Sequence, residues 1–438
     1  MSRTLQRSPA PRLGRPPRYG SALRKWARRA NGPDRLTGAI GLIVFLLAFV
    51  FWPKGIVARS DGELVLFLAL VTLPMILFEI AVARAWAQSD AGLDFTLSGL
   101  MDRLDLRVLA EKTTGVLATV AGIAAIYLFV PLYQDPWYQA TLRPVLNNGI
   151  LLTFVLWAYV MVLHFVSKDP RDGWAEAGRF VLSRGAEGDR AAVFDHTGAT
   201  LIKVFYIPLM FGFARDDWGF FYANALPLNS FREVYEFLYR FLFFIDVVFG
   251  TIGYVVSLRI LNAHIRWPEQ KLSGWLVCLV CYAPFWQVIG RDFLQYDSSI
   301  TWGSLFPENS LTYDIWGTII LLLIAAYASS TVAFAFRFSN LTYRGTVCHG
   351  TYAYVRHPAY LSKNLSYWLI QVPFLAASPR DAIANTLALI AVNLLYYARA
   401  RHEEACCGAH RDYRIYARYL RRFSPVSRAC KAAKELIL

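Results

Sequence analysis

Long apolar runs alternate with short polar segments along most of the chain. Each run is close to the roughly 20 residues that a helix needs to cross the hydrocarbon core of a bilayer. Backbone polar groups inside a bilayer must be satisfied within the segment, so runs of this kind predict helices. We expect an all-α polytopic membrane protein with about ten transmembrane helices, at residues 36–52, 63–83, 114–133, 148–167, 199–213, 237–257, 272–289, 314–336, 362–377 and 382–398.

Composition agrees with the hydrophobic pattern. The chain has 438 residues, of which 56% are hydrophobic and only 17% are charged. A water-soluble domain could not bury so much apolar surface. The sequence therefore predicts an integral membrane protein, of a bacterial inner membrane or the endoplasmic reticulum.

The distribution of charge predicts the orientation of the chain. The net charge is +14, and residues 1–35 form a Pro- and Arg-rich tail that we expect to be disordered and cytosolic. With this tail inside, the even-numbered connections are also inside, and they carry most of the basic loop residues. Both termini are then cytosolic. We expect these basic residues to contact anionic lipid headgroups, and we expect no nucleic acid partner.

Candidate chemistry is concentrated in residues 350–360, which read GTYAYVRHPAY. Pro358 suits the first turn of a helix, and it favours an extended backbone at His357. The free backbone donors of that helix would therefore lie beside Arg356 and His357 and favour an anionic group. The alternative is that Arg356 reaches lipid phosphates and His357 only caps the helix.

A second polar cluster follows the last apolar run. This run continues without Gly or Pro from Ala382 into RARHEEACC, so its helix is expected to project into the cytosol. Ser378 and Pro379 supply a tight turn, which makes a helical hairpin. The hairpin would bring the RHPAY segment close to Arg399, Arg401, Glu403 and Glu404. Carboxylates that face Arg and His can hold a zwitterion or a cation; the alternative is a solvated charged helix.

Three further features have less specific interpretations. Asp246 lies inside an apolar run, and either a neighbouring helix satisfies it or it contacts a substrate. The segment YRIYARYLRR favours an interfacial helix with Tyr413, Tyr416 and Leu420 towards the membrane. We expect no metal site, because the four-residue spacing of His402, Cys406 and His410 along one helix cannot close a tetrahedron.

The two polar clusters together resemble a known family. GTYAYVRHPAYLS, followed after a hairpin by R-x-R-x-E-E-x(8)-Y-x-x-Y and RRFSP, resembles the C-terminal half of the isoprenylcysteine carboxyl methyltransferase and phospholipid methyltransferase group. The resemblance covers roughly residues 343–426. It implies that S-adenosylmethionine binds in a pocket made by the hairpin and the cytosolic C-terminal helix, and that a lipid or prenylated acceptor enters from the bilayer.

The resemblance also implies roles for individual residues. Those that would bind the cofactor are His357, Tyr360, Glu403 and Tyr352. The residues implied as catalytic are Arg356, Arg399, Arg401 and Glu404, which would form the pocket wall or contact an acidic acceptor. The chain departs from the family pattern where Ser362 replaces the usual glycine and is followed by Lys363 and Asn364, and where Ala409 and His410 replace a Phe-Gly pair.

The expected organisation has three parts: the tail at 1–35, a membrane region of about eight helices at 36–336 with no assigned role, and a methyltransferase-like core at 337–438 whose active site faces the cytosol. Two alternatives remain. NADPH-dependent sterol reductases of the C14 type share an RHP-x-Y motif and a similar size, and a transporter or lipid-binding scaffold would need no cofactor. Within the methyltransferase interpretation, the acceptor and the choice between oxygen and nitrogen stay open.

Overall fold

The structure, a computed structural model, describes residues 34–52, 61–96, 98–99, 103–223, 229–296, 300–426 and 428. All but two residues of the expected N-terminal tail lie outside these ranges. Within them the architecture is all-α apart from one short antiparallel pairing of β1 (Trp267–Pro268) with β2 (Thr342–Tyr343) and an isolated antiparallel bridge between Leu93 and Ser167. The helices are α2 (Asp34–Phe51), α3 (Asp61–Ala81), α5 (Leu106–Phe129), α6 (Pro136–Asn147), α7 (Gly149–Val166), α8 (Gly173–Leu182), α9 (Arg190–Ala223), α10 (Phe231–Val255), α11 (Leu272–Leu279), α12 (Trp302–Leu305), α13 (Leu311–Phe334), α14 (Pro358–Gln371), α15 (Pro379–Gly408) and α16 (Arg411–Phe423).

Each predicted apolar run contains helix, and seven helices in the described part of the chain are long and apolar enough to cross a membrane. They are α3, α5, α7, α9, α10, α13 and α15. The all-α membrane class is thus confirmed, whereas the count of ten spans stays a prediction. The predicted seventh run is interrupted: α11 ends at Leu279, before Pro284, and a short π-helix follows at Gln287–Phe293. Proline cannot donate the backbone hydrogen bond that a continuous helix would need.

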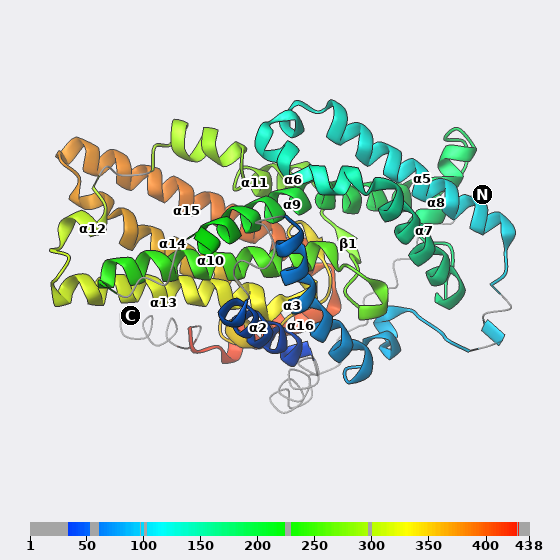
Figure 1. Ribbon diagram of the computed structural model, residues 1–438, viewed down its shortest axis with the longest axis horizontal. Helices are drawn as coiled ribbons and strands as arrows, with labels where there is room; N and C mark the ends of the chain where they lie inside the picture. Colours follow the sequence, from blue (N-terminus) through cyan, green and yellow to red (C-terminus); the bar gives the residue numbers. More distant parts are fainter. Residues whose placement is uncertain are drawn as a thin grey trace.

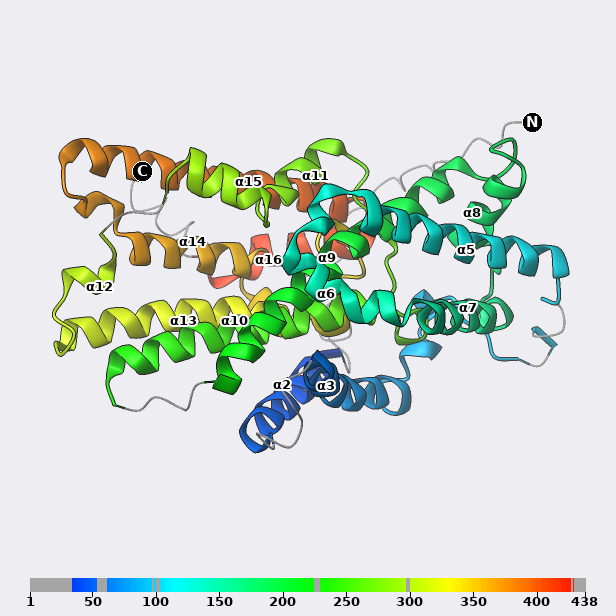
Figure 2. The same cartoon turned by 45° about the horizontal axis from the view of Figure 1, so that its top comes forward.

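The helices form two groups along the long axis of the molecule. One group contains α10, α13, α14 and α15, and the other contains α5, α7 and α8 (Figures 1 and 2). The 34-residue α9 contacts helices of both groups. Phenylalanines dominate the core where α2, α3, α9 and α10 meet, with Phe45, Phe67 and Phe244 fully buried.

The even-numbered connections, which the charge pattern assigns to one face of the membrane, contact one another in the structure. Lys112 Nζ lies 2.9 Å from a carboxylate oxygen of Asp172, which joins the start of α5 to the loop before α8. Gln270 donates a 2.7 Å hydrogen bond to Asp195. The pairing of β1 with β2 then ties the connection after α10 to the connection after α13. The shared face therefore holds the segment that leads into the RHP motif, and its cytosolic orientation stays a prediction.

The group of α5, α7 and α8 depends on one unusually close helix contact. A Cβ atom at Gly178 of α8 would lie 1.7 Å from the backbone oxygen of Glu111, and one at Gly115 of α5 would lie 2.0 Å from the oxygen of Trp174. Neither position can accept a side chain without separating the helices. The two glycines therefore set the distance between α5 and α8.

We predict that Gly178→Ala lowers stability by about 1–3 kcal/mol or more, because the added methyl group overlaps backbone rather than a flexible side chain. Gly122→Ala is the matched control, since nothing lies within 4 Å of a Cβ at that exposed position of α5. Alanine there should be neutral or stabilising by up to about 1 kcal/mol. Thermal unfolding of the two purified variants in detergent measures both effects, and equal melting temperatures would contradict the interpretation.

Candidate functional site

The ends of two helices create the site. α14 begins with Pro358 in its first turn and His357 as its N-cap residue. α15 runs without interruption from Pro379 to Gly408, and the Ser378 hydroxyl caps its start by accepting from the Asp381 amide. The chain reverses between the two helices, so the first turn of α14 lies against the last turns of α15 (Figure 1). The predicted hairpin is confirmed, as is the proximity of RHP to the glutamate pair.

Glu404 binds the basic residues of the RHP motif. Its Oε1 accepts a 2.7 Å hydrogen bond from Arg356 Nη1 and lies 3.3 Å from His357 Nε2. Its Oε2 accepts from Arg401 Nη1 at 3.1 Å. Three basic groups therefore surround a single carboxylate, and this cluster fixes the start of α14 to α15.

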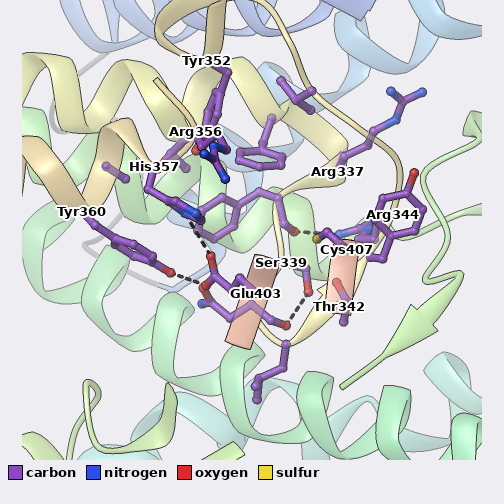
Figure 3. Close-up of a pocket in the computed structure, with 18 of the residues that line it drawn as sticks. Arg337, Ser339, Thr342, Arg344, Tyr352, Arg356, His357, Tyr360, Glu403 and Cys407 are labelled. Carbon is purple, nitrogen blue, oxygen red and sulfur yellow. Dashed lines mark hydrogen bonds and ion pairs between the residues drawn. The ribbon is translucent and has the colours of Figure 1, made fainter. Parts of the chain in front are cut away.

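Glu403 faces the aromatic side of the same junction. The Tyr360 hydroxyl donates to Oε1, and Arg399 Nε donates to the same oxygen at 3.4 Å. His357 Nδ1 lies 3.7 Å from Oε2, so the imidazole is placed between the two carboxylates. The His357 and Tyr360 rings are nearly parallel, with centroids 5.6 Å apart. Figure 3 shows His357 and Tyr360 directed towards Glu403.

Arg399 lies at the centre of a polar network that reaches outside the two motifs. Its side chain is only 5% exposed. Besides Glu403, its Nη2 donates to Asn340 Oδ1 at 2.5 Å and to the Tyr282 hydroxyl at 3.1 Å. Asn340 in turn donates from Nδ2 to the Tyr254 hydroxyl at 2.7 Å. Sequence reasoning missed Asn340 and Tyr282, which occur in unremarkable segments and become partners only through packing.

A second buried cation holds the loop that carries Asn340. Arg344 is 3% exposed. Its guanidinium donates to the backbone oxygens of Ala263, Gly253 and Phe338, the latter two at 2.8 and 2.7 Å. Burial lowers the pKa of Arg344 to about 9. Because three carbonyl groups bind one side chain, the loop after α13 is fixed against the C-terminal end of α10.

These groups surround a cleft that encloses about 1250 Å³, including its open mouth. Its walls come from residues 281–282, α13, the segments 337–347 and 352–357, α14, α15 and α16. Of the predicted site residues, six line it: Tyr352, Arg356, His357, Tyr360, Arg399 and Glu403. Glu404 lies behind this wall in contact with Arg356 and His357, and Arg401 points outward with a 63% exposed side chain.

The prediction for α16 is wrong. Tyr416 and Leu420 are buried against Val347, Cys348 and Tyr352 rather than directed towards the membrane. The Tyr416 hydroxyl donates a 2.8 Å hydrogen bond to the backbone oxygen of Tyr352, and Tyr413 lines the cleft. The apolar face of this amphipathic helix therefore covers the site, because the loop before α14 offers it an apolar surface.

The intramembrane carboxylate Asp246 is satisfied by a neighbouring helix. It accepts hydrogen bonds from Tyr327, at 2.7 Å, and from Thr331, both on α13. The sequence allowed two interpretations of Asp246, satisfaction by a neighbouring helix or contact with a substrate, and these hydrogen bonds correspond to the first. Tyr327 and Thr331 also line the cleft, so the carboxylate lies directly behind its wall.

Comparison of the chain with protein-family models, with curated proteins and with solved structures gave no match.

We predict that Arg399→Leu destabilises the protein by about 3–5 kcal/mol, because it leaves Glu403 and Asn340 without their buried partner. Arg401→Leu, two residues away on the same helix, removes only an exposed ion pair and should cost less than about 1 kcal/mol. Thermal unfolding of both variants in the same detergent distinguishes the two. Similar losses for both would show that the buried network is not the stabilising element.

Proposed function

We propose that the protein is a membrane-embedded, S-adenosylmethionine-dependent methyltransferase that acts on a lipid or lipidated acceptor. The observation that carries the proposal is the convergence of His357, Tyr360 and Glu403 in one cleft between the α14–α15 hairpin and α16. The family resemblance implies a cofactor pocket made by the same three helices.

The residues in the cleft fit the chemical groups of this cofactor. Its ammonium group would bind the Glu403 carboxylate, and its carboxylate would bind cationic groups such as Arg356. The rings of Tyr282, Tyr360 and Tyr396 also line the cleft and give it an aromatic surface against which the cofactor would pack. In addition, Thr342 Oγ1 is buried on the same wall without a partner among the described residues, which suits a ligand that brings a polar group.

The bound cofactor would supply an electrophilic methyl group on a positively charged sulfur. Transfer of this group consumes charge, so a dry and well-aligned site contributes more than a strong base. Arg399 and Tyr360 hold Glu403 in one orientation, which positions the carboxylate before any ligand binds. The side chains of Tyr352 and Tyr416 are both buried in the wall that α16 covers, and the Tyr416 hydroxyl donates to the backbone oxygen of Tyr352.

We predict that Glu403→Gln weakens binding of S-adenosylmethionine by tenfold or more, because one charge-assisted hydrogen bond contributes about 1.5–3 kcal/mol. His357→Ala should also weaken it, since it removes a contact of Glu403. Glu308→Gln is the matched control, because Glu308 is half exposed and pairs with Arg232 away from the cleft. Calorimetry on the detergent-purified protein measures all four affinities.

NADPH is titrated in parallel, because it separates the proposal from its alternatives. Binding of NADPH without S-adenosylmethionine would favour a sterol reductase. Binding of neither ligand to the wild-type protein would favour a transporter or scaffold.

A further inference from the structure

A second concavity lies outside the proposed cofactor cleft, where several connections between helices meet. It encloses about 620 Å³, including its open mouth. Its walls come from the connections after α3, α10 and α13 and from the segment that joins α15 to α16. Among the described residues that line it, only Tyr343 also lines the cleft. This junction pocket is therefore a separate space that shares one wall with the cleft.

Three side-chain nitrogens of residues that line the junction pocket are buried and have no hydrogen-bond partner in the described part of the chain. They are His264 Nδ1, Arg266 Nε and His410 Nε2. A buried polar atom without a partner is uncommon in a folded protein, and a bound ion is one explanation for it. Because three such nitrogens gather at one pocket, a ligand with several acceptor oxygens accounts for them together.

Positive charge is concentrated beside these nitrogens. A Cβ atom at Gly345 would lie 3.7 Å from Arg266 Nη1 and 3.6 Å from Arg337 Nε, so two guanidinium groups approach the same point of the backbone. Burial, followed by repulsion from Arg337, lowers the pKa of Arg266. One carboxylate contacts this guanidinium: Asp90 Oδ2 lies 3.3 Å from Arg266 Nη1, but the Asp90 side chain is 55% exposed. The exposed Arg411 adds a further cation to the pocket lining.

The two histidines of the pocket respond to this positive charge. Burial, followed by the charges of four arginines, lowers the pKa of His264 to about 3. Burial and the charge of Arg266 also lower the pKa of His410. Both imidazoles are therefore neutral near pH 7, and each can donate one hydrogen bond without adding charge.

The first turn of α16 brings backbone donors to the same pocket. His410 is the N-cap residue, but its side chain makes no capping hydrogen bond. The imidazole instead stacks on the ring of Tyr343, with the ring centroids 3.7 Å apart. The amides of a first turn have no partner within the helix, and the helix dipole places partial positive charge there, so both features favour an anion. The one carboxylate of this turn, Asp412, belongs to an exposed residue.

We propose that the junction pocket binds a phosphate monoester through Arg266, Arg411 and the first turn of α16. Such a group carries a charge of about −1.5 to −2 at pH 7 and three acceptor oxygens, which suits donors that converge from separate segments. A guanidinium can bind two of these oxygens at once. The site goes beyond the proposed function and does not depend on it. Its occupant would connect α16, which covers the cleft, to the segment after α10, and so hold this cover in place.

Phosphate monoesters occur both on soluble molecules and on lipid headgroups, so the test of the full chain has two arms. In the first, glycerol 3-phosphate is titrated by calorimetry into the protein in phosphatidylcholine nanodiscs. In the second, the unfolding temperature is compared between nanodiscs that contain equal fractions of phosphatidate, a lipid monoester, or phosphatidylglycerol, a lipid diester. Binding in the first arm identifies a soluble ligand, and higher stability with phosphatidate identifies a lipid headgroup.

Arg411→Gln should weaken binding of glycerol 3-phosphate by about tenfold and remove any stabilisation by phosphatidate, because it deletes a charged donor. Arg266→Gln should have the same effects. Arg421→Gln is the matched control, since Arg421 is also exposed but lies in the last turn of α16, and this variant should behave as the wild-type protein does.

Absence of glycerol 3-phosphate binding, together with equal unfolding temperatures in the two lipid mixtures, would overturn the proposal from the wild-type protein alone. Wild-type affinity and stabilisation in Arg411→Gln would also overturn it. This second result is decisive even if Arg266→Gln fails to fold, because Arg411 is an exposed position where glutamine is compatible with the helix.

Discussion

The burial of the Arg399 cation is the constraint on which the site depends. A guanidinium removed from water must find partners for its donors, and here the partners come from three separate parts of the chain. Glu403 is on the same helix, Tyr282 follows the interrupted α11, and Asn340 belongs to the loop after α13. Each of these groups is placed by its bond to Arg399. The orientation of Glu403 then determines where Tyr360 and His357 can lie.

Arg344 is the second buried cation near the cleft, and its partners are backbone groups rather than side chains. It binds backbone carbonyls, including that of Gly253 close to the end of α10. The last carbonyls of a helix have no intrahelical donor and carry partial negative charge, so a cation at this position is stabilised on both counts. The loop between residues 338 and 344 is therefore fixed on two sides, by Arg344 to α10 and by Asn340 to Arg399. A short loop with two buried anchors forms a rigid wall for the cleft.

Local rules were sufficient to predict the parts of the site that depend on adjacent residues. Pro358 after His357 predicted the start of α14, and the absence of Gly and Pro after Ala382 predicted that α15 would continue through both glutamates. The partners of Arg399 could not be predicted in this way, because nothing near Asn340 or Tyr282 in the chain marks them as polar contacts of a distant helix.

Two further differences from the prediction have identifiable causes. The predicted seventh run contains Pro284, which cannot donate the backbone hydrogen bond of a continuous helix. The hydrophobicity of the run does not reflect this missing donor. For α16 the amphipathic pattern was correct, but a pattern alone does not distinguish a lipid surface from a protein surface as the partner of the apolar face.

The separation of the site's components along the chain also bears on how the protein is made. Tyr282 and Asn340 are synthesised well before Arg399, Glu403 and Tyr416, and domains are translated from the N-terminus at about 5–20 residues per second. At this rate, several seconds pass between the synthesis of Tyr282 and Asn340 and the synthesis of their partner Arg399. The cleft closes only when the last fifth of the chain has left the ribosome. A truncated chain that lacks α15 or α16 would therefore leave Tyr282, Asn340 or the backbone oxygen of Tyr352 without its partner.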